Sequence, residues 1–207
     1  MITEIQHPLV KTLVNRLRSS QTDALRFRHT VGELAKILVY EAFTPSPLTR
    51  KSIVTWQGEQ TNSFIDEEAL IFVPILRAGL PMLEGVIEVF SDAQSGFLAM
   101  KRDETTHQSV LYYDRLPDCT NKTVIILDPM VATGGSLCDA LNVIKSKKPK
   151  KIISLNIIGS PEGLEVVKQK HPDIDLYIAR VDKGLDENMF IIPGLGDAGD
   201  RAYNTPE

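Results

Sequence analysis

The sequence predicts an α/β fold in which a parallel sheet carries helices on both faces. Between about residues 69 and 180, apolar β-branched runs alternate with segments of helical periodicity, which is the pattern of parallel strands joined by crossover helices. The run ALIFVPIL at 69–76 is continuously apolar, as expected of a strand that is buried on both faces. No linker of different composition interrupts the chain. We therefore expect one domain over residues 1–207.

The part of the chain before this alternating region is expected to add helices and a hairpin. Apolar residues recur at helical spacing in LRFRHTVGELAKILVYEAF, and Thr22 and Asp23 precede it as candidate caps. Two prolines in FTPSPL end that helix. The stretches on either side of QGEQ indicate a hairpin, in which we expect Trp56 to pack. These elements are helices over 9–18 and 25–43 and strands over 52–56 and 62–65.

The later elements place several polar segments at one edge of the sheet. Parallel sheets bind ligands at the carboxyl ends of their strands, so the segments after residues 76, 100 and 128 are candidate site segments. The charged stretch 101–109 is expected to be a mobile loop in a small β hood over 101–116. Strands are predicted over 69–76, 95–100, 110–114, 123–128, 151–160 and 175–180, and helices over 79–90, 136–147 and 161–170.

Composition excludes several classes of protein. The net charge of −4 gives no overall attraction to nucleic acid, and the longest apolar runs are too short to span a bilayer. Cys119 and Cys138 form no CxxC pair and the histidines are scattered, so we expect neither a disulfide framework nor a zinc site. The start MITEIQHPLV is not a signal peptide. We expect a cytoplasmic protein without nucleic-acid or membrane partners.

The segment VIILDPMVATGGS at 124–136 joins a strand to a small-residue turn before a helix. The backbone amides, the hydroxyls and the helix start can together surround a phosphate, although the lysine of a GxxxxGK[ST] loop is absent. A carboxylate repels a phosphate, so we expect Asp128 to bind another part of the ligand, for which two adjacent ribose hydroxyls are suitable. A sugar phosphate is the expected ligand; a helix-capping turn without a ligand is the alternative.

Two arginines that follow neighbouring strands are candidates for binding a second anion. Arg77 lies in PILRAGLP directly after the most apolar strand, where its guanidinium suits pyrophosphate. Arg102 leaves the next strand and enters the hood, whose closure would exclude water. The alternatives are a surface arginine in a turn and a solvated loop.

The segment IIPGLGDAGDR at 191–201 is rich in glycine and predicts a stiff, compact turn. Exposed backbone donors and acceptors in such a turn can read the edge of a planar base. Asp197 is the carboxylate in its middle. The alternative is a plain C-terminal turn or an acidic loop.

These segments together resemble the type I phosphoribosyltransferases over nearly the whole chain. DPMVATGGS at 128–136 is similar to the phosphoribosyl-diphosphate motif of that family, which in most members has two adjacent acids. The second position here is Pro129, as in the uracil phosphoribosyltransferases. HPLV at 7–10, YEA at 40–42, and the segments ILRAGL, RDE and PGLGDAGDR agree with that branch.

The resemblance implies a transferase of pyrimidine salvage that moves the 5-phosphoribosyl group from 5-phosphoribosyl 1-diphosphate to uracil, giving UMP and diphosphate. It implies catalytic roles for Arg102, Asp128 and Asp197, a non-proline cis peptide near Arg77, and Mg²⁺ carried by the diphosphate without a direct protein ligand. The implied donor-binding residues are Arg77, Arg102, Asp128, Pro129, Met130, Val131, Ala132, Thr133, Gly134, Gly135, Ser136 and Asp197, and the implied uracil-binding residues are Ile191, Gly196, Asp197 and Ala198.

The resemblance also implies a homodimer or homotetramer, and it leaves open an activation by GTP through N-terminal basic residues, of which Arg26 and Arg28 are present. Lys101, Phe190 and Asn204 depart from the family pattern. Two other functions stay open: an RNA-binding pyrimidine regulator on the same fold, and a phosphoribosyltransferase for another nucleobase such as hypoxanthine. Pro129 and the net acidity disfavour the first, and the PGLGDAGD segment disfavours the second.

Overall fold

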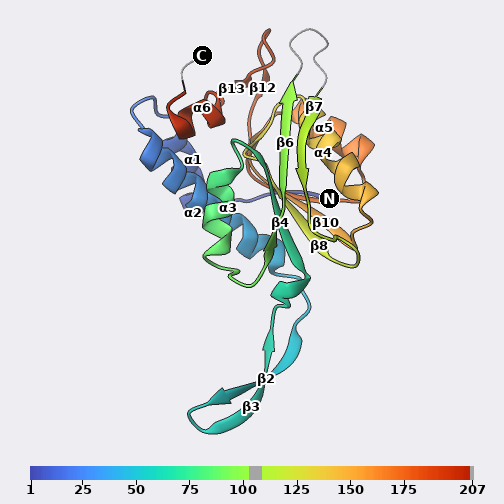
Figure 1. Cartoon of the computed structure of the whole chain (residues 1–207). Helices are drawn as coiled ribbons and strands as arrows, with labels where there is room; N and C mark the ends of the chain where they lie inside the picture. Colours follow the sequence, from blue (N-terminus) through green and yellow to red (C-terminus); the bar gives the residue numbers. More distant parts are fainter. Residues whose placement is uncertain (103–108, 206–207) are drawn as a thin grey trace.

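A nine-stranded sheet forms the centre of the described part of the molecule (Figure 1). The computed structural model describes residues 1–102 and 109–205, without the side chains of residues 101, 102, 109 and 110. The strands run parallel, except that the edge pair β6–β7 is antiparallel. Their order is β1 (Ile2–Glu4), β11 (Asp175–Val181), β10 (Lys151–Gly159), β8 (Thr123–Leu127), β4 (Leu70–Leu76), β6 (Phe97–Arg102) and β7 (Ser109–Arg115), with β5 (Gln94–Ser95) beside β4 and β9 (Met130–Val131) beside β10.

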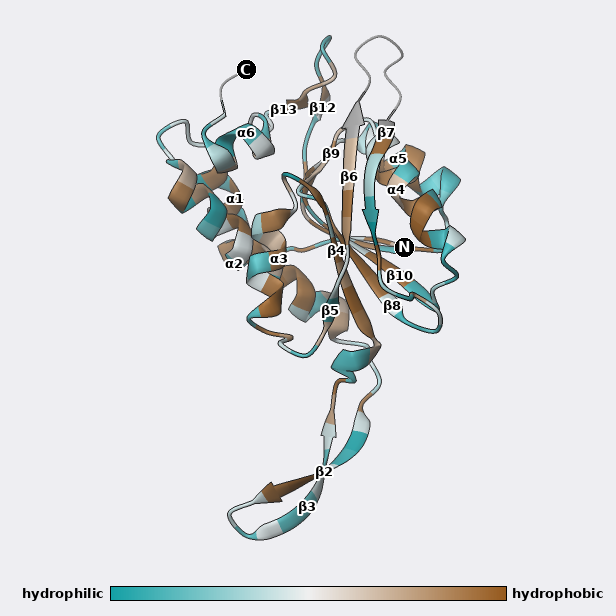
Figure 2. Cartoon of the chain, viewed as in Figure 1, coloured by the Kyte–Doolittle hydropathy of each residue, from teal (hydrophilic) through white to brown (hydrophobic). Residues whose placement is uncertain are grey.

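Helices cover both faces of this sheet, which confirms the predicted fold class. Successive side chains of β4 point to opposite faces: Phe72 packs in the cluster formed with α1, α2 and α3, whereas Ile71 and Val73 pack in the cluster formed with α4 and α5. The central strands are accordingly hydrophobic along most of their length (Figure 2). The helices are α1 (Pro8–Arg18), α2 (Ala24–Phe43) and α3 (Leu80–Ile87) on one face, and α4 (Gly135–Ser146) and α5 (Pro161–Lys170) on the other.

The starts of the N-terminal helices follow the capping chemistry of the sequence. Asp23 precedes α2, and its carboxylate accepts a hydrogen bond of 2.8 Å from the backbone N–H of Arg26, as predicted. His7 precedes α1, and its Nδ1 accepts from the backbone N–H of Leu9. Pro8 occupies the first turn of α1, where its missing N–H costs nothing. The two helices are therefore fixed by local sequence, and α1 ends at Arg18.

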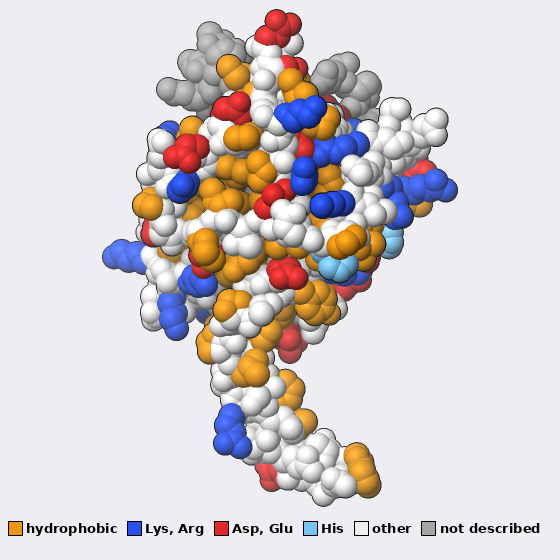
Figure 3. Space-filling view, turned by 180° about the vertical axis from the view of Figure 1, so that it is seen from behind, with side chains coloured by type: hydrophobic (Ala, Val, Ile, Leu, Met, Phe, Trp, Pro, Cys, Tyr) orange, Lys and Arg blue, Asp and Glu red, His pale blue; other side chains and the backbone are white. Residues whose placement is uncertain are grey.

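The hairpin of β2 (Thr49–Thr55) and β3 (Gly58–Phe64) projects away from the body of the molecule (Figure 1). Its strands are longer than predicted, and the turn lies at residues 56–57 rather than at QGEQ. The expectation that Trp56 packs in the hairpin is wrong, because the residue is 92% exposed. A two-stranded ribbon has no second layer against which a large side chain could be buried. Figure 3 shows hydrophobic side chains along this ribbon and at its end.

The C-terminal part adds three short elements that the sequence did not predict: β12 (Gly184–Leu185), β13 (Ile191–Ile192) and α6 (Ala198–Tyr203). They lie at the end of the molecule opposite the β2–β3 hairpin (Figure 1). Residues 103–108, the central part of the predicted hood and of the loop expected to be mobile, are outside the described residues. Within the described part of the chain, no helix is long and apolar enough to cross a membrane.

Candidate functional site

A cleft of about 630 Å³ opens where β4, β6 and β8 end. This is the edge at which the sequence placed the candidate site, since ligands of parallel sheets bind at strand carboxyl ends. Two segments form much of its lining: the cradle loop, defined as residues 128–136, and the tail loop, defined as residues 191–201. The lining residues are Ile75, Leu76, Arg77, Ala78, Met100, Asp128, Met130, Ala132, Ser136, Asn188, Met189, Phe190, Ile191, Gly196, Asp197, Ala198 and Gly199.

Asp128 follows β8 and is buried, with 9% of its surface exposed. Its carbonyl oxygen accepts a 2.7 Å hydrogen bond from Nδ2 of Asn156, whose Oδ1 in turn accepts from the Ser154 hydroxyl at 2.8 Å. Burial raises the pKa of the Asp128 carboxyl to about 7, against the weaker opposing effect of the backbone N–H of Met130. A buried polar pair therefore fixes the backbone of Asp128, while its side chain changes charge near neutral pH.

The rest of the cradle loop is packed closely against the start of α5. Gly134 has φ +77°, and a Cβ on it would lie 2.5 Å from the carbonyl oxygen of Gly163. A Cβ on Gly163 would lie 2.1 Å from the carbonyl oxygen of Ala132. The hydroxyl of Ser160 donates to that same Ala132 oxygen at 2.6 Å and accepts from the backbone N–H of Gly163 at 2.9 Å. Only glycine permits this approach, which holds the loop at the N-terminus of α4.

The predicted residues of the cradle loop divide into two groups. Some line the cleft, while others face the protein or lie at the helix start, where backbone amides rather than side chains are presented. The lining residues are Asp128, Met130, Ala132 and Ser136, and those that do not line the cleft are Pro129, Val131, Thr133, Gly134 and Gly135.

Arg77 stands at the mouth of the cleft directly after β4, and the peptide bond before it is cis, as predicted. Its Nη2 donates to Oδ1 of Asp200 at 2.9 Å, and its Nη1 donates to the Thr205 hydroxyl at 3.1 Å. Thr205, and then Arg77, lower the pKa of the Asp200 carboxyl by hydrogen bonding. Asp200 is therefore a partner of Arg77 that sequence reasoning missed. The sequence feature that could have indicated it is that Asp200 is the second acid of GDAGD.

The tail loop brings its predicted residues to the lining of the same cleft. The bond between Ile192 and Pro193 is cis, and Gly194 and Gly196 have φ values of +60° and +79°. The carboxylate Oδ1 of Asp197 accepts a 2.8 Å hydrogen bond from the backbone N–H of Asp200 and so caps α6. Ile191, Gly196, Asp197 and Ala198 all line the cleft.

The cleft also contains residues that the sequence did not single out as binding groups. The cleft is also lined by three residues that precede the tail loop, Asn188, Met189 and Phe190. Met100 of β6 and Leu76 of β4 line it as well. Phe190 was noted only as a departure from the family pattern. Their exposure is a property of the folded loop rather than of a motif, so periodicity could not reveal it.

The predicted role of Arg102 concerns a side chain outside the described part of the structure. Its backbone ends β6, in register with Ser109 of β7. The side chain of Lys101 is likewise not described. Among the residues that the structure describes, no three His, Cys, Asp or Glu side chains are grouped as metal ligands.

Comparison with known proteins identifies relatives over almost the full length. The family model for uracil phosphoribosyltransferase matches residues 4–205. A uracil phosphoribosyltransferase of Aquifex aeolicus is 46% identical over 203 residues, covering 98% of both chains. Another, from Dictyoglomus turgidum, is 39% identical over 206 residues and covers 99% of this chain and 100% of its own.

Two solved structures resemble the chain in fold. The structure of a protein from Aquifex aeolicus matches with a TM-score of 0.95 at 46% identity, over 98% of both chains. A hypoxanthine-guanine phosphoribosyltransferase of Bacillus anthracis matches with a TM-score of 0.52 at 17% identity, over 77% of this chain and 80% of its own. The second match shows a shared fold only.

Proposed function

This chain belongs to the uracil phosphoribosyltransferase family, an enzyme family that forms UMP and diphosphate from uracil and 5-phosphoribosyl 1-diphosphate, and we propose how the residues of the cleft divide that reaction. The observation that carries the division is that a buried carboxylate with its cradle loop and the glycine-rich tail loop line one cleft. The first suits a sugar phosphate and the second a planar base.

The cradle loop binds the phosphoribosyl group in this proposal. The backbone amides at residues 132–136 and the start of α4 hold the 5-phosphate, since a helix N-terminus favours an anion. Asp128 accepts hydrogen bonds from the two ribose hydroxyls, and its ionised form is the stronger acceptor. Arg77 exchanges its contact with Asp200 for the diphosphate, which it can bind through two nitrogens. Arg102 is assigned to the same diphosphate by family resemblance.

The tail loop binds uracil and orients it for attack on C1 of the ribose. Backbone groups near Gly196 and Ala198 read the polar edge of the base, while Ile191 packs against the ring. Oδ1 of Asp197 is used by the cap of α6, so we assign Oδ2 to the positive charge that develops on the ribose. Positioning two substrates in one cleft supplies much of the rate.

Magnesium is proposed as the cofactor, carried by the diphosphate. The carboxylates among the lining residues are Asp128 and Asp197, and Asp128 is followed by Pro129 rather than by a second acid. This donor set fits an ion that is held mainly by phosphate oxygens. When bound, the ion neutralises charge on the leaving diphosphate.

A nucleobase panel tests the function directly. Labelled 5-phosphoribosyl 1-diphosphate is incubated with Mg²⁺ and each base, and the products are separated. We expect UMP from uracil and no nucleotide from hypoxanthine or orotate. A purine nucleotide, with no UMP, would assign the cleft to another base. Binding of pyrimidine-operon leader RNA in a filter assay would instead support the regulator that the sequence left open.

The assembly, effector and location are further proposals. A homodimer or homotetramer is supported by Val54 and Trp56, which are 88% and 92% exposed on the projecting hairpin. We therefore expect Trp56→Ser to weaken assembly, as measured by sedimentation.

Activation by GTP is supported by a surface hollow that Arg16, Arg26 and His29 help to line, and initial rates with and without GTP test it. A cytoplasmic location is supported by two buried thiols that form no disulfide.

A further inference from the structure

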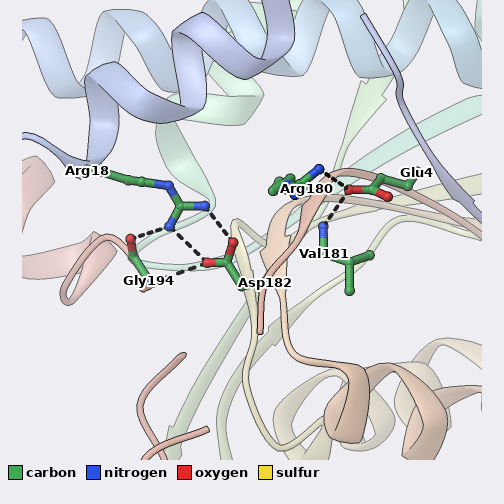
Figure 4. Close-up of polar contacts among 6 residues, drawn as sticks. All are labelled: Glu4, Arg18, Arg180, Val181, Asp182 and Gly194. Carbon is green, nitrogen blue, oxygen red and sulfur yellow. Dashed lines mark hydrogen bonds and ion pairs between the residues drawn. The ribbon is translucent and has the colours of Figure 1, made fainter. Parts of the chain in front are cut away.

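A buried ion pair outside the cleft holds the middle of the tail loop. Arg18, the last residue of α1, donates from Nη1 to Oδ2 of Asp182 at 2.9 Å and from Nη2 to Oδ1 at 2.5 Å (Figure 4). Asp182 follows β11, and its side chain is 2% exposed, while that of Arg18 is 19% exposed. Neither residue lines the cleft. This fork geometry is the strong, directional form of an ion pair.

Both members of the pair also bind the backbone of Gly194. Nη1 of Arg18 donates to the carbonyl oxygen of Gly194 at 2.6 Å, and the N–H of Gly194 donates to Oδ2 of Asp182 at 3.1 Å. Gly194 has φ +60°, and a Cβ on it would lie 2.1 Å from the carbonyl oxygen of Ile191. The pair therefore fixes the tight turn at Gly194.

A second arginine ties the far end of the tail loop to the same end of α1. Arg201 donates from Nη1 to the carbonyl oxygens of Leu17 and Leu195, and from Nη2 to that of Ser19 at 2.7 Å. Carbonyl oxygens at a helix C-terminus carry partial negative charge and favour a cation. The last turn of α1 thus contacts the tail loop on both sides of Gly196.

We propose that Arg18 and Asp182 are positioning residues for the base, which set where Ile191 and residues 196–198 stand in the cleft. The inference rests on the proposed assignment of the tail loop to uracil. Neither residue touches a substrate in this proposal; they act through Gly194. Their loss should weaken recognition of the base most, whereas the cradle loop of the donor site is held by separate contacts, such as that from the Ser160 hydroxyl to the carbonyl oxygen of Ala132.

Arg180, two residues before Asp182, offers a control. Arg180 pairs with Glu4 at 3.3 Å, and Glu4 also accepts from the backbone N–H of Val181 (Figure 4). This arginine likewise joins the N-terminal segment to the end of β11, but its described contacts do not include the tail loop. Arg180→Met removes a weaker and more exposed ion pair at the same end of β11 without removing a contact to Gly194.

The test compares Arg18→Lys, Arg18→Met and Arg180→Met by steady-state kinetics with each substrate varied. Arg18→Met leaves Asp182 buried without a cation, and this variant can fail to fold. Lysine keeps the charge but cannot form the two-nitrogen contact, so Arg18→Lys still tests the role of that contact. We expect KM for uracil to rise about tenfold in Arg18→Met and less in Arg18→Lys. KM for the donor should change less than twofold, as should every constant of Arg180→Met.

The outcomes separate this inference from the function on which it rests. Equal increases in both KM values, unchanged KM values in folded Arg18→Lys, or the same shift in Arg180→Met would overturn the positioning role while leaving UMP synthesis in place. If the unsubstituted chain forms no UMP from uracil, the proposed function fails, and the role of the pair in uracil binding fails with it.

Discussion

The two sides of the cleft are held in place by different kinds of interaction. The cradle loop is fixed mainly by backbone contacts that only glycine permits, at Gly134 and Gly163, with hydrogen bonds from the neutral side chains of Asn156 and Ser160. The tail loop is fixed by side chains, because the guanidinium groups of Arg18 and Arg201 bind its carbonyl oxygens. A contact between backbones tolerates almost no added atom, whereas a side-chain contact can be weakened in steps. Substitutions should therefore disable the cradle side sharply and adjust the tail side gradually.

The difference also separates the substrates. The cradle loop holds the donor and the tail loop holds the base in our proposal, and few of their contacts are shared. Arg77 joins them, since it follows β4 and donates to Asp200 of the tail loop. Changes on the cradle side should raise KM for the donor, and changes on the tail side should raise KM for uracil.

The largest effect is expected from Asp128→Asn. The amide cannot accept from two ribose hydroxyls as a carboxylate does, so kcat/KM for the donor should fall by about 10³-fold. The fold should persist, because an amide oxygen can still accept from the backbone N–H of Met130, as Oδ1 of Asp128 does. Steady-state kinetics measure kcat/KM for the donor, and circular dichroism checks that the fold persists. A loss of less than threefold would remove Asp128 from the donor site.

Gly163→Ala should have the next largest effect. The new Cβ would lie 2.1 Å from the carbonyl oxygen of Ala132, so the cradle loop must move, and a displacement of this kind can cost about 10²-fold in kcat/KM. Overpacking should also lower the free energy of unfolding by about 1–3 kcal/mol.

The control for stability is Gly135→Ala in the cradle loop itself. A Cβ at Gly135 would meet only the Thr133 hydroxyl, at 3.7 Å, so its free energy of unfolding should change by no more than about 0.5 kcal/mol. Equal destabilisation of the two variants in urea titrations would show that the backbone contact is not what fixes the cradle side.

The pH dependence of stability gives an effect of intermediate size. The folded-state pKa of Asp128 is raised to about 7 from its ordinary value of 3.8, so the folded chain binds more protons than the unfolded chain between these values. The contribution of Asp128 to stability is therefore lost as pH rises toward and through about 7. Without ligands, Asp128→Asn should gain about 2–3 kcal/mol relative to the unsubstituted chain between pH 5 and pH 8. If the free energies of unfolding of the two chains changed in parallel between pH 5 and pH 8, the raised pKa of the buried Asp128 carboxyl would be contradicted.

Much of this comparison was readable in the sequence, although not all of it. The parallel sheet follows from apolar strands such as 69–76, and the cleft follows because strand ends meet at one edge. Asp128 and the tail glycines were visible as motifs. The partners of these groups were not: Asp200 binds Arg77 across 123 positions, and Arg18 binds Asp182 across 164. Such pairs depend on how elements pack, which no local pattern records.

Trp56 shows the same limit in the opposite direction. Its sequence context indicated a packed hairpin, because aromatic residues are common in strands. Burial, however, depends on whether a second layer exists, and the β2–β3 ribbon has none within the described chain. Local propensity thus predicted the hairpin but not the environment of its side chains.

The smallest effect is expected from Arg201→Lys on the tail side. Arg201 donates to three carbonyl oxygens and lies over the ring of Phe27 at 4.5 Å. Lysine keeps the charge near the end of α1 but cannot make the same set of planar contacts. KM for uracil should rise about threefold to fivefold, with KM for the donor unchanged, since the loop is loosened rather than displaced.

Lys36→Met is a control for the loss of polar contacts that lie away from the cleft. Nζ of Lys36 lies 3.0 Å from Glu33 on α2 and 2.6 Å from Glu88, which directly follows α3. Lys36 does not line the cleft. Its substitution should leave both KM values within about twofold, because exposed ion pairs contribute little. If Arg201→Lys raised KM for the donor rather than for uracil, the two sides of the cleft would not be independent. The division between a cradle held by backbone and a tail held by arginines would then have to be abandoned.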